Sequence, residues 1–97
     1  MSDYEVLLGD DARDFLAAAD EKITRICKEK LGYLAENPYP GRGQGDKEKL
    51  PIDGRRDRFR LHISRSYTAI YTVIEDGSEV RVLESLPIDD AHKRYGF

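Results

Sequence analysis

The stretch Asp57–Ser85, DRFRLHISRSYTAIYTVIEDGSEVRVLES, decides the fold of this 97-residue chain. Apolar and polar side chains alternate along it, which is the pattern of strands that bury one face. It therefore reads as three consecutive strands, residues 57–63, 66–75 and 79–85. Asp76-Gly77 is typical of a tight β-hairpin turn, and Ser64-Arg65 leaves only a short connection between the first two strands. Both connections predict antiparallel pairing.

Two amphipathic helices are expected before these strands. Tyr4–Leu8 is a short opening strand that ends at Gly9, and Asp10 is expected to cap the first helix. Asp20 is expected to cap the second helix, which must end before Asn37-Pro38 because the residue before proline disfavours helical backbone. The apolar positions are Ala12, Phe15, Leu16 and Ala19 on the first helix, and Ile23, Ile26, Cys27, Leu31 and Leu34 on the second. Such consecutive helices form a hairpin.

The remaining segments complete an α+β prediction. Residues 37–54 are rich in glycine and proline and read as a loop with a short extended piece at 50–52. Residues 86–97 read as a short C-terminal turn or helix. The expected fold is one domain over residues 1–97, in which a helix hairpin packs on one face of a small antiparallel sheet in the order β-α-α-β-β-β. The opposite face of the sheet is expected to be free.

Composition narrows the class of protein. With 39% hydrophobic and 36% charged residues, and neither a long apolar run nor a signal peptide, the chain is expected to be a cytoplasmic globular protein without membrane contact. Cys27 stands alone, which excludes a disulfide or a cysteine-rich zinc site within the chain. The two histidines, His62 and His92, are 30 positions apart and are a weak basis for a metal site. We expect no cofactor.

Basic charge is concentrated in one part of the chain. The net charge is −3, yet Arg55, Arg56, Arg58, Arg60 and Arg65 form a cluster that only Asp57 opposes. Strand alternation places Arg58, Arg60 and His62 on one face at intervals of roughly 6–7 Å, which is close to the spacing of RNA phosphates. Arg81 is expected to join them. A solvated strand face would show the same pattern, so the pattern alone does not distinguish a binding surface.

Several segments together resemble the RelE/ParE superfamily of toxin-antitoxin modules. The resemblance is carried by the opening strand, the helix hairpin that ends in Asn37-Pro38-Tyr39-Pro40, Lys49-Leu50-Pro51, Arg58-Phe59-Arg60-Leu61, Tyr67-Thr68-Ala69-Ile70-Tyr71 and His92-Lys93-Arg94-Tyr95. The family's toxins share a helix hairpin followed by an antiparallel sheet, and the order of the segments covers nearly the whole chain.

The resemblance implies a ribosome-dependent mRNA endonuclease that a partner antitoxin holds inactive. Arg58 and Arg60 match a pair of basic residues in the RelE branch, and His92–Tyr95 are counterparts of a C-terminal basic group with a tyrosine. An arginine of the branch on the following strand is replaced by Thr68. Arg65 or Arg81 could supply its charge from nearby.

Attack of a ribose 2′-OH on the adjacent phosphate needs a proton acceptor, a proton donor and cations around the phosphorus. Arginine suits the cation role but is a poor base, whereas histidine titrates near neutrality. The predicted catalytic residues are Arg58, Arg60, His92 and Tyr95, with His92 favoured over His62 as acid or base. The predicted RNA-binding residues are Arg55, Arg56, His62, Arg65, Arg81, Lys93 and Arg94.

Two other functions fit the same residues. A ParE-like protein would inhibit DNA gyrase without catalysis, and a degenerate relative would bind only a protein or RNA, as the acidic pI of about 5.4 and Thr68 both favour. For a toxin, the expected partners are the ribosome, mRNA and an acidic, amphipathic antitoxin whose helix packs beside the hairpin and covers the basic face or distorts the C-terminal turn.

Overall fold

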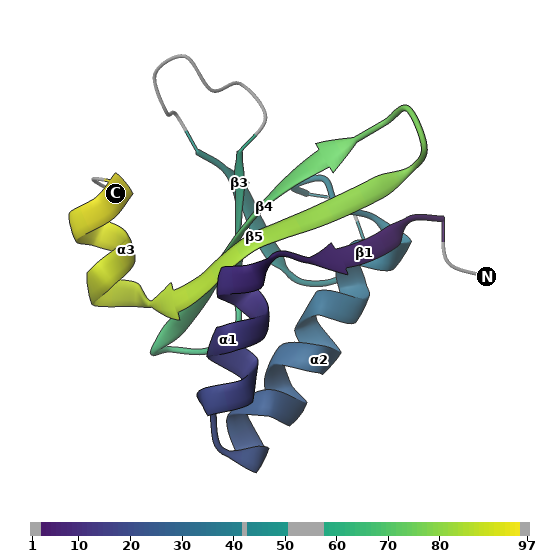
Figure 1. Ribbon diagram of the computed structural model, residues 1–97. Helices are drawn as coiled ribbons and strands as arrows, with labels where there is room; N and C mark the ends of the chain where they lie inside the picture. Colours follow the sequence, from purple (N-terminus) through teal and green to yellow (C-terminus); the bar gives the residue numbers. More distant parts are fainter. Residues whose placement is uncertain (1–2, 42, 51–57, 96–97) are drawn as a thin grey trace.

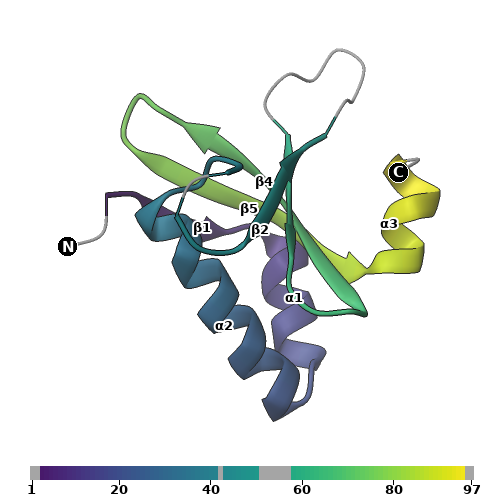
Figure 2. The same cartoon turned by 180° about the vertical axis from the view of Figure 1, so that it is seen from behind.

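The computed structural model describes residues 3–41, 43–50 and 58–95, which form one five-stranded sheet and three helices. The elements are β1 (Glu5–Leu8), α1 (Asp10–Ala18), α2 (Glu21–Glu36), β2 (Asp46–Lys49), β3 (Phe59–His62), β4 (Tyr67–Ile74), β5 (Glu79–Pro87) and α3 (Ile88–Tyr95). The strand order is β1-β5-β4-β3-β2, so that β1 (Figure 1) and β2 (labelled in Figure 2) form the two edges. This arrangement confirms the expected α+β class, the helix hairpin and the three central strands. None of the helices in these ranges is long and apolar enough to cross a membrane.

The sheet departs from the expected one at both edges. β1 pairs with β5 in parallel, with Glu5 opposite Glu79, so the sheet is mixed and not wholly antiparallel. β2 lies inside residues 37–54, where the sequence predicts a loop, and it pairs antiparallel with β3. All four residues of β2 are charged, so the sequence shows no apolar alternation there. The strand is held at the edge of the sheet by its backbone pairing with β3. Of the extended piece expected at 50–52, Leu50 is buried, and the other two residues lie outside the described ranges.

The two helices of the hairpin begin with different caps. Asp20 caps α2 as expected, since its Oδ1 accepts a hydrogen bond from the Ile23 N–H at 2.8 Å. Asp10 is instead the first residue of α1, and Gly9 takes the cap position. The Gly9 N–H donates to the Val82 carbonyl at 2.8 Å, and a Cβ on Gly9 would lie 3.1 Å from the same oxygen. The chain turns so close to β5 that a glycine is favoured there.

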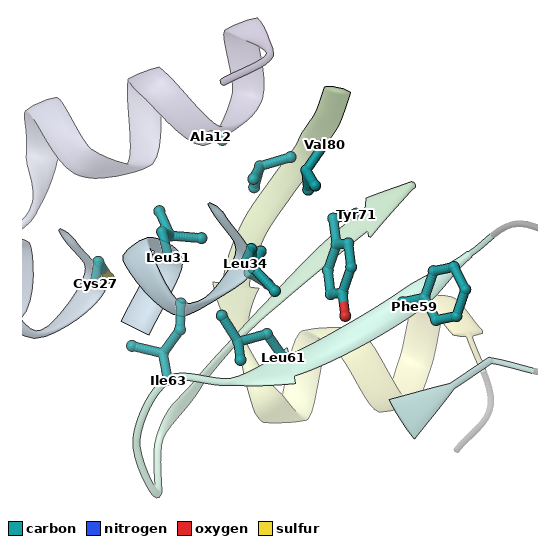
Figure 3. Packing of buried hydrophobic residues seen from close by; sticks show 11 residues of the cluster. Ala12, Cys27, Leu31, Leu34, Phe59, Leu61, Ile63, Tyr71 and Val80 are labelled. Carbon is teal, nitrogen blue, oxygen red and sulfur yellow. The ribbon is translucent and has the colours of Figure 1, made fainter. Parts of the chain in front are cut away.

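The main hydrophobic core lies between the helix hairpin and one face of the sheet. Figure 3 shows the side chains of Leu31 and Leu34 from α2 against Leu61 and Tyr71 from the sheet. The buried members are Ala12, Cys27, Leu31, Leu34, Phe59, Leu61, Ile63, Ala69, Tyr71, Val80 and Val82. The four members on the helices, Ala12, Cys27, Leu31 and Leu34, were expected to face the core from their helical periodicity. Burial raises the pKa of the Cys27 thiol, which fits an unreactive core cysteine.

A second, smaller core covers part of the sheet face that the sequence predicts to be free. α3 packs on β4 and β5, and its Ala91 joins Leu50, Ile70 and Leu86, with Leu83 against them. Figure 2 shows α3 at the end of β5, well away from the α1–α2 hairpin. The sequence misses this helix packing because Ala91, the α3 residue found in this core among the described side chains, is small and stands between Asp90 and His92.

Two glycines, Gly32 and Gly45, differ in how much room they leave for a side chain. Gly32 lies within α2, is exposed, and has no atom within 4 Å of a Cβ built on it. We expect Gly32→Ala to raise the free energy of unfolding by about 0.5–1 kcal/mol, because alanine lowers the entropy of the unfolded chain and favours helix. Gly45→Ala should lower it, since Gly45 has φ +99° and its Cβ would lie 3.1 Å from the Tyr33 ring. Urea unfolding of both variants measures the difference, and a destabilised Gly32→Ala would contradict the expectation.

Candidate functional site

The candidate site is a column of three side chains on β3 and the residue before it. Phe59, Leu61 and Ile63 are buried against the helix hairpin, so alternation directs Arg58, Arg60 and His62 to the opposite face. Leu50, on the same side of the sheet, donates its backbone N–H to the Arg58 carbonyl at 2.9 Å and extends the pairing past the end of β2. The predicted placement of Arg58, Arg60 and His62 on one face of the strand agrees with this arrangement.

β2 places two carboxylates beside this column. Asp46 is the cross-strand partner of His62, and Glu48 is the partner of Arg60. The Arg60 Nη2 and Glu48 Oε1 atoms form an ion pair in which 11% of the arginine side chain and 48% of the glutamate side chain are exposed. The face is therefore a paired surface of acids and bases and not a purely basic one.

Burial lowers the pKa values of two residues in this column, His62 and Arg60. The pKa of His62 is lowered, first by burial and then by the charge of Arg60, while Asp46 acts in the opposite direction. A neutral imidazole therefore stands next to a guanidinium, and a neutral imidazole can accept a proton. Burial also lowers the pKa of Arg60. A guanidinium is so basic that the side chain remains positively charged at neutral pH.

The lowered pKa of His62 makes stability depend on pH. The unfolded chain binds this proton near the ordinary pKa of 6.5, above the folded value. The free energy of unfolding should therefore fall as pH drops from about 6.5 through the folded pKa, because the unfolded state then holds more protons. In His62→Gln this contribution is absent, and urea unfolding at pH 7 and pH 5 should show a smaller loss. An equal loss in both proteins would contradict the assignment to His62.

Thr68 is buried at the position where the resemblance implies a cation. Its side chain is fully inaccessible, and its Oγ1 donates to the Leu61 carbonyl at 3.0 Å. The threonine therefore bonds to the backbone of β3 and presents no group to a ligand.

The two arginines that could supply the charge missing at Thr68 lie on other parts of the fold. Arg65 is exposed beside the turn that joins β3 to β4. Arg81 shares the site's face of the sheet, but it pairs with Glu79 at 3.2 Å and lies on β5, two strands from Arg60. Arg81 was expected to join Arg58, Arg60 and His62. It shares their face of the sheet but lies two strands away from Arg60.

The C-terminal group lies on α3, which packs on the same side of the sheet. His92 and Lys93 are exposed there. The side chains of Arg94 and Tyr95, together with Arg55 and Arg56, fall outside the described part of the chain. Of the predicted site residues, the structure thus brings Arg58, Arg60 and His62 together and places His92 and Lys93 on the neighbouring helix.

Sequence reasoning missed the acidic side of this surface. Besides Asp46 and Glu48, Glu84 lies buried on β5 opposite Ile70, which in turn is opposite Arg60. The only sequence signal was the alternation of acidic and basic residues in Asp46–Lys49, which complements the bases of β3. These carboxylates do not form a metal centre, since no group of three suitable ligands occurs among the residues that the structure covers.

The fold has clear relatives among solved structures. No protein-family model and no curated protein sequence matches the chain. A chain of the archaeal RelE-RelB complex from Pyrococcus horikoshii OT3 is 24% identical over 88% of this chain and 94% of that chain, with a TM-score of 0.72.

Two structures from E. coli give similar values. The isolated RelE toxin is 19% identical over 94% of this chain and 97% of its own length, with a TM-score of 0.68. A chain of the DinJ-YafQ toxin-antitoxin complex is 11% identical over 91% and 96%, with a TM-score of 0.69. The chain described here therefore has the fold of the RelE/ParE-type toxins.

Proposed function

We propose that this protein is the toxin of a type II toxin-antitoxin pair and that it cleaves mRNA on the ribosome. The observation that carries the proposal is the placement of His62 beside Arg60 on one face of β3, opposite the helix hairpin, where burial lowers the pKa of the imidazole. A base and a phosphate-binding cation side by side are what attack by a 2′-OH requires.

The sequence favours His92 over His62 as the acid or base, but here we assign the base to His62, because it lies beside Arg60 and burial lowers its pKa. In this reaction His62 accepts the proton of the 2′-OH, and the oxygen attacks the adjacent phosphorus. The P–O5′ bond then breaks, which leaves a 2′,3′-cyclic phosphate and a new 5′-OH once the leaving oxygen takes up a proton. Arg58 and Arg60 balance the charge on the phosphate. His92 and Tyr95 on α3 are the candidates for the proton donor, and the basic side chains around them would hold the RNA strand.

An antitoxin partner is part of the proposal. The similar solved structures include an archaeal RelE-RelB complex and the DinJ-YafQ toxin-antitoxin complex. For this chain we expect a partner that covers the column on β3 or shifts α3. Expression of the protein alone should arrest growth, and co-expression of the chain encoded beside it should relieve the arrest.

The direct test uses purified protein, translating ribosomes and a defined mRNA, with the new 5′ ends mapped. Cuts within codons in the ribosomal A site, and none in free mRNA, support the proposal. Intact mRNA from folded protein would overturn it, and an assay of gyrase supercoiling would then test the ParE-like alternative.

Two observations favour a second function, which is RNA or protein binding without cleavage. Thr68 is buried where the resemblance implies an arginine, and Glu48 already neutralises Arg60. A protein of this kind would bind ribosomes without shortening the mRNA. Co-sedimentation with ribosomes, run beside the cleavage assay, separates the two functions.

A further inference from the structure

The ion pair between Glu48 and Arg60 bears on how the candidate site would take up a phosphate. Both residues lie on the site's face of the sheet, and β2 and β3 hold them directly opposite each other. A cross-strand pair of opposite charges has Cβ atoms roughly 5 Å apart, so the two side chains meet without any movement of the backbone.

Exposure differs sharply between the two partners. Glu48 is about half exposed, whereas 11% of the Arg60 side chain is accessible. A phosphate that approaches this face therefore meets the carboxylate before it meets the guanidinium. Because Glu48 lies on an edge strand, its side chain can turn into water while β2 stays paired with β3.

We infer that the Glu48 carboxylate competes with phosphate for the Arg60 guanidinium, so that an RNA phosphodiester can bind this arginine only when it displaces the carboxylate. The inference rests on the proposed function, since it names Arg60 as part of the RNA-binding face. It assigns Glu48 a regulatory effect that lowers RNA affinity.

The surrounding charges support competition. Among the described residues, the residue directly opposite Glu48 is Arg60. Two further carboxylates lie on the same face: Asp46, two residues before Glu48 on β2, and Glu84, which lies on β5 opposite Ile70, the cross-strand partner of Arg60. Phosphate and carboxylate use the same N–H donors of arginine, so the two anions exclude each other at one edge of the guanidinium. Half exposure of Glu48 keeps the ion pair weak enough for a phosphate to replace it.

The test measures binding of a fluorescent single-stranded RNA whose 2′ oxygens are methylated, so that the RNA binds but cannot be cleaved. We expect Glu48→Gln to lower the Kd about threefold to tenfold relative to the wild type. Glutamine keeps an oxygen that can accept the Arg60 hydrogen bond, so the fold is retained, and thermal unfolding confirms this. Glu36→Gln, an exposed change of the same charge at the end of α2, is the matched control and should leave the Kd within about 1.5-fold.

The Arg60→Ala background separates competition from simple repulsion. If Glu48 competes for Arg60, the gain from Glu48→Gln should fall by at least half when Arg60 is absent. An equal gain in both backgrounds, or no gain in the wild-type background, would overturn the inference. The cleavage assay is independent of this outcome, because Glu48→Gln can tighten binding in a protein that does not cut mRNA.

Discussion

Replacing Arg58 and Arg60 together with alanine is expected to reduce ribosome-dependent cleavage at least about 100-fold, because both cations that would face the scissile phosphate are lost. The fold should survive. Arg58 is only partly buried, and the partner that Arg60 leaves behind, Glu48, is half exposed and can be hydrated. The measurement is the yield of mapped 5′ ends per ribosome as a function of protein concentration.

The matched control for this variant is Lys22→Ala with Arg25→Ala on α2. Both residues are exposed on the helix hairpin, and the double change removes the same charge from the other side of the molecule. The control should cut mRNA at nearly the wild-type rate. Equal losses in the two double variants would mean that overall charge, and not the column on β3, determines cleavage.

Tyr71→Ala is expected to lower the free energy of unfolding by about 3–5 kcal/mol, which is enough to unfold a small domain at 37 °C. Tyr71 is fully buried in the main core, where its ring stacks on Phe59 with centroids 5.4 Å apart. Burial raises its pKa far above the ordinary value, so the phenol stays protonated and donates to the Pro38 carbonyl at 2.6 Å. Denaturant unfolding followed by circular dichroism measures the loss.

Tyr71→Phe separates the ring from its hydroxyl. This variant keeps the stacking on Phe59 but leaves the buried Pro38 carbonyl without its donor, so we expect a loss of about 1–2 kcal/mol. The bond joins β4 to the segment after α2, across 33 positions of sequence. A stability equal to the wild type would show that water replaces the hydroxyl at that carbonyl.

Most of the fold could be predicted because its signals are local. The apolar period of α2, the cap at Asp20 and the alternation around Leu61 each identify an element from neighbouring residues, and the structure confirms them. The two errors at the sheet edges concern long-range pairing. β2 carries no apolar residue, and the parallel pairing of β1 depends on a partner more than seventy positions away.

The site could be predicted only in part for a related reason. Alternation is a property of one strand, so it placed Arg58, Arg60 and His62 on one face. Which groups oppose them depends on the register between strands, and a strand of mixed charges gives no independent evidence of its register. The pairs that Asp46 and Glu48 form with β3 therefore became visible only in three dimensions.

The parallel contact between β1 and β5 also constrains synthesis of the protein. The opening strand finds its partner only in residues 79–82, and β5 also separates β1 from the rest of the sheet. Loop-closure entropy disfavours such distant pairing until both segments are available. A growing chain therefore cannot assemble the sheet before β5 has left the exit tunnel. Until residues 79–82 have emerged, the opening strand of a nascent chain has no partner in the sheet, and its backbone hydrogen-bonding groups stay open to other contacts.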